Sequence, residues 1–460
     1  MKHSKDLIAC LSLLVVSLVL SGCGGLLPRS RYAPPEVALP QKWQEPTVTG
    51  SSVATKEHWW RDFNDPVLSG LIEKALTTNN DLAAATLKVK RAQLAARLTD
   101  TNLTPSLSAN ATSSLNRNLN NRTDTKSSGA TLSASYELDL WGKLASARDA
   151  SRWEAEATDA DRRSTALALI GTVAADYWTV AYLNERIASV EASIANAERV
   201  LELVEVQYQA GAVSALDKLQ AQQTVASQKA QATELQQQRT EARNALAILF
   251  NQAPEHGVPE RQRLPKGDVP QVQAGIPASL LSQRPDLQAA EQRLRKYLAS
   301  VDSTRASYYP SFTLTGTLGT SSTSLIEVIK NPYAALGAGL ALPFIQWNTM
   351  HLNVEMAKTD YEEAVVNFRQ TLYTALSDVE NALAARKNYA DEVTQLQESL
   401  ALARKAEQLA EVRYQTGSTA LQAWLDAQES RRDAERALAA VRLNRLKNCM
   451  TLYQALGGTL

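Results

Sequence analysis

Histidine and cysteine, which often carry catalysis or bind metals, number only four and three in this sequence, and no known catalytic constellation is present. The four histidines lie far apart, without metal-site spacing: His3, His58, His256 and His351. No phosphate-binding loop, dinucleotide fingerprint or Gly-x-Ser-x-Gly motif is present. Asp286, in Arg-Pro-Asp, fits a carboxylate at a helix N-terminus better than an acid catalyst. We therefore expect no enzyme, no metal and no cofactor beyond a covalent lipid, so any energy source must be a partner.

The surroundings of Cys23 indicate that lipid. A basic start with Lys2 and Lys5 precedes an apolar run, residues 7–20, which is as long as a signal h-region and too short to span a bilayer. Leu-Ser-Gly then precedes Cys23, which looks like a bacterial lipoprotein signal with cleavage before an acylated cysteine. The alternative is an ordinary signal peptide with an incidental cysteine. Gly24 follows, not the Asp that commonly retains lipoproteins in the inner membrane, and this points to the outer membrane.

The charge balance argues against a nucleic-acid-binding protein, and the cysteine content argues against a protein held by disulfides. Basic and acidic residues number 48 each, so there is no electrostatic argument for nucleic acid. Cys10 leaves with the signal and Cys23 is expected to carry lipid, so Cys449 has no disulfide partner within the chain. No later run has 18 consecutive apolar residues, which predicts no transmembrane helix in the mature chain. A membrane crossing would then require a closed β-barrel.

Two Tyr-Gln-x-Gly turns, at 208–211 and 414–417, end two segments that are almost free of helix breakers. Residues 351–416 contain no Gly or Pro, and residues 143–210 contain only Gly171. A helix of about 65 residues is roughly 100 Å long. Gly211 and Gly417 are expected to end these helices with positive φ. Tyr208 and Tyr414 are predicted to pack or hydrogen-bond near the turns, with a gate role as the second interpretation.

The sequence repeats itself at a near-constant shift. Asp81-Leu82 corresponds to Asp286-Leu287 and Pro105-Ser106 to Pro310-Ser311 at a shift of 205, and the two turns correspond at 206. A fixed register over about 150 residues argues for duplication of one unit rather than chance similarity between helix-rich segments.

Each repeat is predicted to start with a helix of roughly 35 residues, at about 67–103 and 278–308. Apolar residues at steps of two then predict strand hairpins at about 105–141 and 310–346, the first with a polar loop at 120–129. The alternating positions are Leu132, Ala134, Tyr136, Leu138, Leu140, Phe312, Leu314, Gly316, Leu318, Leu336, Ala338, Leu340, Leu342 and Phe344. The length of these predicted strands suits tilted membrane-spanning strands, although a soluble hairpin would show the same alternation of apolar and polar residues. Four strands are too few to close a barrel, so several chains would have to pool them.

The long helices are expected to pair with shorter ones. After each Gly turn the chain is predicted to return as a helix, at 214–251 and 418–456, and apolar residues from 187 to 208 follow the coiled-coil period. Residues 252–277 are expected to form a partly structured belt. Residues 24–65 are Pro-rich, and we expect an extended strap that is docked on the body by His58, Trp59, Trp60 and Phe63.

Several motifs in order along the chain resemble the TolC-like outer-membrane efflux factors, in their lipidated branch. They are Trp-Arg-Asp-Phe-Asn-Asp-Pro-Val-Leu (60–68), Asn-Asp-Leu (80–82), Gln-Arg-Pro-Asp-Leu (283–287), Tyr-Pro-Ser (309–311), Ser-Asp-Val-Glu-Asn-Ala-Leu (377–383) and Leu-Asp-Ala-Gln (425–428). The resemblance covers essentially the whole mature chain. It implies a mainly α fold with a β-barrel: a homotrimer with twelve outer-membrane strands and twelve helical struts forming a periplasmic tunnel. It also implies two partners, a periplasmic adaptor (membrane fusion) protein and an inner-membrane pump of RND or ABC type.

Asp426 is the strongest site candidate, nine positions after Gly417, where the first repeat has Gln220. In a trimer three such carboxylates would meet at one axis and attract cations; the alternative is a solvent-facing helix residue. Related chains often have an acidic residue and a Leu three and four positions earlier. This chain has Ala423 and Gln422 at those positions, so its aperture is expected to be less charged and less apolar than in related chains. The resemblance also places adaptor contacts at the hairpin tips: Gly211, Ala212, Val213, Gly417, Ser418 and Thr419.

A second departure lies after the fourth strand. Relatives often continue Pro and an apolar pair with Gly, whereas this chain has Gln-Trp-Asn-Thr at 346–349, so a different turn is expected. The resulting domain plan is a signal (1–22), a lipidated strap (23–65), repeat 1 (66–270, tip 208–214) and repeat 2 (271–457, tip 414–420).

The expected function is an outer-membrane exit duct for small molecules such as drugs or toxic compounds, fed by a tripartite efflux pump. One alternative is the outer-membrane component of a polypeptide secretion system. Another is a periplasmic coiled-coil lipoprotein without a pore, which the alternating strands argue against. The sequence does not identify the cargo.

Overall fold

The computed structural model describes residues 29–45, 57–254, 256–323 and 330–459. Cys23, the predicted lipid site, lies outside them. The chain divides into two compact units: Met1–Val37, Leu87–Ala160 and Gln288–Gln370 form the first, and Ala38–Thr86, Asp161–Leu287 and Thr371–Leu460 the second.

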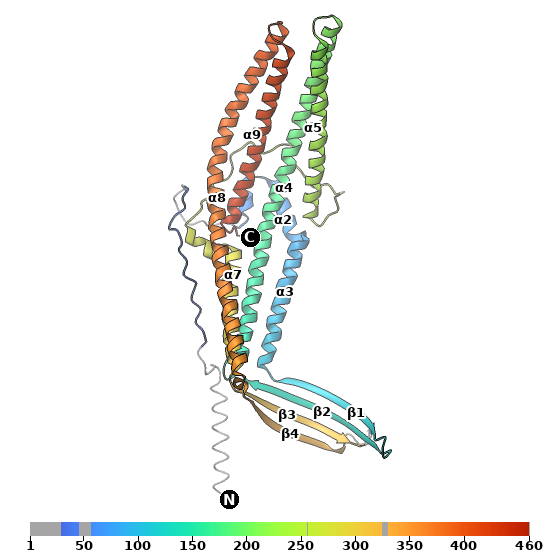
Figure 1. Ribbon diagram of the computed structural model, residues 1–460, viewed down its shortest axis with the longest axis vertical. Helices are drawn as coiled ribbons and strands as arrows, with labels where there is room; N and C mark the ends of the chain where they lie inside the picture. Colours follow the sequence, from blue (N-terminus) through green and yellow to red (C-terminus); the bar gives the residue numbers. More distant parts are fainter. Residues whose placement is uncertain (1–28, 46–56, 255, 324–329, 460) are drawn as a thin grey trace. The chain divides into compact units, whose positions relative to one another are not determined.

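Helices dominate both units (Figure 1). They are α2 (Pro66–Thr78), α3 (Asn80–Asp100), α4 (Lys143–Gln209), α5 (Ala215–Ile248), α6 (Leu280–Gln283), α7 (Pro285–Ala306), α8 (Trp347–Gln415) and α9 (Leu421–Ala455). The predicted long helices are confirmed, since α4 has 67 residues and α8 has 69. The strands are β1 (Ser106–Arg117), β2 (Asp124–Leu138), β3 (Ser311–Ser322) and β4 (Pro332–Ala341).

The first unit contains one antiparallel sheet in the order β1-β2-β3-β4. Pairing of β2 with β3 joins the hairpins of the two repeats, with Leu132 opposite Leu318 and Leu138 opposite Phe312. Strands β1 and β4 are the edges, and every residue of both is exposed. The sheet therefore carries apolar side chains that nothing in the described chain covers.

The predicted strand ends were partly wrong. Strand β2 already begins at Asp124, which shortens the predicted loop at 120–129. Leu140, Leu342 and Phe344 continue the alternation but lie beyond the ends of β2 and β4. After β4, Pro343–Ile345 form a 3₁₀ turn because proline lacks the N–H that a ladder needs, and α8 starts at Trp347.

The first helix of each repeat is interrupted, which the sequence-based prediction of single helices at 67–103 and 278–308 missed. Asn79 has extended backbone angles, and its side-chain oxygen accepts from the Leu82 N–H at 3.0 Å, capping α3. Its amide donates to the Leu249 carbonyl at 3.0 Å. Arg284 is extended between α6 and α7 because residue 285 is proline, which disfavours helix before it.

The second unit contains the two helical hairpins (Figure 1), and each has its own apolar core. In the α4–α5 hairpin, Ile187 and Val190 pack with Leu235. In the α8–α9 hairpin, Val393 and Leu400 pack with the α9 cluster residues Ala434, Leu438 and Val441. The predicted apolar spacing therefore marks the buried faces of α4, apart from Tyr208 at its end, which is exposed.

Both hairpins end in the same C-cap. Gly211 and Gly417 have φ of +73°. The next N–H groups, of Ala212 and Ser418, bond to the carbonyls of Gln207 and Arg413, five residues back, at 2.8 and 2.9 Å. This is the Schellman arrangement, which needs a residue with positive φ. The predicted helix-ending role of both glycines is confirmed.

The predicted docking of the aromatic segment is confirmed for Trp59, Trp60 and Phe63, whereas His58 is exposed and its ring contacts Trp60. Trp59 and Trp60 are each 1% exposed, and Trp59 stacks on Tyr453 with ring centroids 4.5 Å apart. Phe63 contacts Trp178 and Tyr453.

The predicted belt crosses the second unit without helix or strand in the described part of residues 252–276. Side chains of the long helices hold its backbone: Asn184 donates to the Arg261 carbonyl at 2.9 Å, and Arg386 to that of Val272 at 3.0 Å.

One described helix, α4, has an 18-residue window of mean hydropathy 1.4, which is long and apolar enough to cross a membrane by composition. About two thirds of that window, 67%, is buried inside the structure, as expected of a core helix in a helical bundle.

Candidate gate at the hairpin ends

The ends of the two hairpins share one apolar cluster. Its buried residues come from α4 (Val200, Val204), α5 (Ala221), α8 (Tyr414) and α9 (Leu421, Trp424, Leu425). Val204 and Leu421 are almost fully buried, at 0% and 1% exposed. Since the cores farther along each hairpin are separate, this cluster holds the two hairpins together at their tips.

Tyr414 is the centre of this contact. Its ring is 8% exposed and stacks on Trp424, with centroids 5.3 Å apart and an interplanar angle of 28°. Its hydroxyl donates to Oε1 of Gln207, on the other hairpin, at 2.6 Å. Burial, and then the charge of Asp217, raise the pKa of Tyr414, so the hydroxyl stays protonated as a donor. We call the Tyr414–Gln207 bond with the Trp424 stack the tip latch.

Tyr208, the other predicted gate tyrosine, does not take part in the latch. Its side chain is 43% exposed, and the Lys218 ammonium lies 5.7 Å from the ring centroid. Gln207 and Trp424 were not among the predicted site residues. Gln207 directly precedes the Tyr-Gln-x-Gly turn at 208–211, but its partner is 207 residues away, and the sequence carries no signal for that pairing.

Asp426 lies on the opposite face of α9 from the cluster. Its neighbours Trp424 and Leu425 are buried in the cluster, whereas Asp426, Gln422 and Ala423 are exposed. The Gln422 amide donates to Oδ1 of Asp426 at 2.6 Å. Asp426 therefore presents a negative charge that is bonded to a neutral amide and turned away from the packed core, whereas Glu429, one turn further on, is paired with Arg432.

The predicted adaptor-contacting tips are open. A Cβ added to Gly211 or Gly417 would meet nothing within 4 Å. Ala212 is exposed, and Val213 packs against the tip cluster. The Ser418 hydroxyl donates to the Arg413 carbonyl at 2.9 Å, and Thr419 is half-buried. The first tip leads into α5 through a capping box between Ser214 and Asp217.

Asp286 takes the position predicted for it, in the first turn of α7. Its carboxylate accepts from Nε and Nη2 of Arg284 at 3.0 and 2.7 Å. Among the described residues no group of three His, Cys, Asp or Glu side chains could hold a metal ion.

The paired long hairpins, the duplicated sheet and the capped tips agree with comparisons to known proteins. The family profile described as outer membrane efflux protein matches residues 71–252 and again 276–458. The chain belongs to this family. The two matches correspond to the duplication seen in the sequence. Members of the family are channel proteins of the outer membrane that extend into the periplasm, and this chain is an outer-membrane efflux channel.

Relatives of this efflux protein match over nearly the whole chain. It is 34% identical to the pyoverdine export outer membrane protein OpmQ of Pseudomonas putida, over 97% of both chains. It is 30% identical to the cation efflux system protein CusC of Escherichia coli, over 96% of this chain and 98% of CusC. The open-state structure of the Neisseria gonorrhoeae MtrE outer membrane channel is similar with a TM-score of 0.81 and 33% identity, covering 94% of this chain and 98% of MtrE.

Proposed function

We propose that three copies of this efflux protein form one exit duct, with a twelve-stranded barrel and a tunnel of twelve helical struts. The open sheet carries this proposal. Within the described residues the edges of β1 and β4 have no partner strand, and Leu336 on β4 is 95% exposed. In hydrocarbon every backbone donor and acceptor must be paired, so such a sheet has to complete its ladder with other copies.

The periplasmic hairpins supply the contact with a pump. We propose that the open tips, at 211–213 and 417–419, meet a periplasmic adaptor protein that connects the duct to an inner-membrane pump of RND or ABC type. The channel itself performs no chemistry in this scheme, and the pump supplies the energy. The adaptor opens the channel by binding the open state more tightly than the latched one.

Small molecules are the proposed cargo. OpmQ is named for pyoverdine export and CusC for cation efflux, and both match this chain over nearly their full length. Such different solutes passing through similar channels favour a duct whose cargo is chosen mainly by the attached pump. A polypeptide secretion role remains the second candidate, and identification of the co-purifying pump would decide between the two.

Replacing Asp426 tests the aperture. We expect Asp426→Asn to lower the preference of the channel for cations over anions in planar bilayers and to raise its conductance, because three like charges no longer meet at the axis. If the three carboxylates stabilise a passing cation by about 1 kcal/mol, the cation-to-anion permeability ratio of Asp426→Asn falls about fivefold.

A control variant is available on α8. Asp391→Asn removes the same charge from an exposed helix position outside the tip, and its currents should match those of the unmodified protein. Unchanged selectivity in Asp426→Asn would remove this residue from the aperture.

We also propose a lipid on Cys23, which would hold the mature N-terminus in a membrane leaflet. Cells given a labelled fatty acid should incorporate it into the full chain but not into the Cys23→Ser variant. Cys449→Ser is the matched control and should keep the label, since Cys449 is 3% exposed and burial raises the pKa of its thiol to about 12. Label that persists in Cys23→Ser would contradict the proposal.

A further inference from the structure

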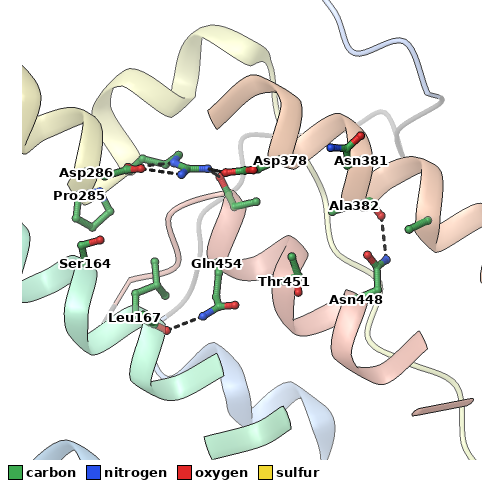
Figure 2. Close-up of a pocket in the computed structure, with 14 residues that line it drawn as sticks. Ser164, Leu167, Pro285, Asp286, Asp378, Asn381, Ala382, Asn448, Thr451 and Gln454 are labelled. Carbon is green, nitrogen blue, oxygen red and sulfur yellow. Dashed lines mark hydrogen bonds and ion pairs between the residues drawn. The ribbon is translucent and has the colours of Figure 1, made fainter. Parts of the chain in front are cut away.

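A cavity of about 530 Å³ lies in the second unit, where α4, the start of α7, α8 and the end of α9 meet (Figure 2). The gate and tips do not use it. Ligand sites in proteins commonly have volumes of about 300–1,000 Å³. Small apolar groups line part of it, including Ala168, Pro285 and Ala385, and polar ends of side chains line the rest. The cavity therefore has a wall against which an apolar group can pack, and polar atoms that can orient a ligand.

Arg284 is the one cation among the described residues that line the cavity, and its charge is already neutralised. Its guanidinium bonds Asp286 through Nε and Nη2, and its Nη1 donates to Oδ2 of Asp378 and to the Ala455 carbonyl, both at 3.2 Å. Burial would lower the pKa of Arg284, but the two carboxylates hold it above its usual value. One guanidinium faces two carboxylates, so the cavity lining carries one net negative charge.

Three amides at the cavity each donate one N–H to another group of the protein. Asn448 donates to the Ala382 carbonyl and Gln454 to the Leu167 carbonyl, both at 2.9 Å (Figure 2). Asn381 donates to the Ser377 hydroxyl at 3.3 Å. A backbone carbonyl accepts only from an NH₂ group, which fixes the orientation of the first two amides. The carbonyl oxygens of Asn448 and Gln454 are acceptors that a ligand can use, beside the second N–H of each NH₂ group.

We propose that this cavity binds small organic ammonium compounds, with the –NH₃⁺ group on the oxygens of Asp378 and the neighbouring amides and the apolar body against the alanines and proline. A primary ammonium has three donors and no acceptor, which matches a lining of acceptors with net negative charge. A carboxylate of the same shape would meet the net negative charge of the lining, whose cation, Arg284, is already paired. The inference rests on the proposed duct, in which the cavity is a transient site for cationic cargo.

The test compares two ligands that share a phenyl body. Purified full-length protein in lipid nanodiscs is dialysed to equilibrium against phenethylammonium or against 3-phenylpropanoate. We expect the ammonium to bind and the carboxylate to bind at least tenfold more weakly. Asp378→Asn should weaken ammonium binding about tenfold, because it removes the charge but leaves Arg284 paired with Asp286. Glu380→Gln is the matched control: it lies on the same turn of α8, contacts the Gln44 N–H instead, and should bind as the unmodified protein does.

Equal binding of the two ligands, or equal affinity in Asp378→Asn and the unmodified protein, would overturn the assignment. Bilayer conductance of the same preparation separates this failure from that of the duct. If the protein conducts ions but binds both ligands equally, the proposed duct stands and the proposed ammonium site is wrong. If it binds phenethylammonium but does not conduct, the proposed duct is wrong.

Discussion

Gly457→Ala is expected to destabilise the protein more than the same change at Gly142, Gly211 or Gly417, which also have positive φ. Gly457 follows α9 with φ of +76°, and a Cβ there would lie 2.6 Å from the backbone C and O of Gln283 and 2.8 Å from N of Arg284. The collision is with backbone, which cannot rotate away. Left-handed backbone alone costs about 1–2 kcal/mol for alanine. Displacing the α6–α7 junction adds the loss of the Arg284 bond to the Ala455 carbonyl, about 1.5–3 kcal/mol.

Gly417→Ala provides the matched control for this prediction. Its φ is +73°, almost the same as at Gly457, but a Cβ there meets nothing within 4 Å. It should therefore show only the conformational cost. We expect the apparent Tm of the full chain in detergent to fall further for Gly457→Ala than for Gly417→Ala. Equal shifts would mean that α9 does not dock on the α6–α7 junction as described.

Tyr414→Phe is expected to make the isolated channel open more often. The change keeps the ring on Trp424 but removes the 2.6 Å bond to Gln207, which links the two hairpins. A hydrogen bond contributes about 0.5–1.5 kcal/mol net, and three latches in one trimer would act together. A shift of about 2–4 kcal/mol toward the open state corresponds to roughly 30- to 1,000-fold in population. Single-channel recordings without adaptor should show longer open times and higher mean conductance.

Two further variants test whether the effect of Tyr414→Phe comes from the tip latch. Trp424→Ala removes the stacking partner and about 3–5 kcal/mol of packing, so it should open the channel further than Tyr414→Phe. Tyr208→Phe is the control, because the Tyr208 side chain is 43% exposed and its hydroxyl has no bond within the described residues. If Tyr208→Phe and Tyr414→Phe raise conductance equally, the Tyr414–Gln207 bond is not what holds the channel closed.

Local signals were sufficient to predict the long helices and their ends. The absence of Gly and Pro predicted α4 and α8, and the Tyr-Gln-x-Gly turns predicted the Schellman caps at Gly211 and Gly417. The break at Arg284 was also readable in principle from Pro285, because the residue before proline disfavours helix. The break at Asn79 was readable in the same way, because Thr77, Thr78, Asn80 and Asp81 around it are poor helix formers and Asn is a common N-cap.

Long-range contacts could not be predicted in this way. The sequence shows a glycine, Gly171, inside α4 but not what a larger residue would meet there. In the structure the amide of Gln454 lies 2.1 Å from the position of a Cβ on residue 171. The same holds for the tip latch, since no periodicity relates Gln207 to Tyr414. The cavity around Arg284 combines four helices, and its ligand preference depends on which way two amides point, a property of the packed structure alone.

Electron cryo-microscopy of the purified full-length protein in lipid nanodiscs tests the central claim most directly. The account predicts a three-fold symmetric particle in which β4 of each chain pairs with β1 of the next and the long helices surround a continuous lumen. A particle with one chain, or with three chains whose sheets stay open at β1 and β4 and enclose no lumen, would contradict it.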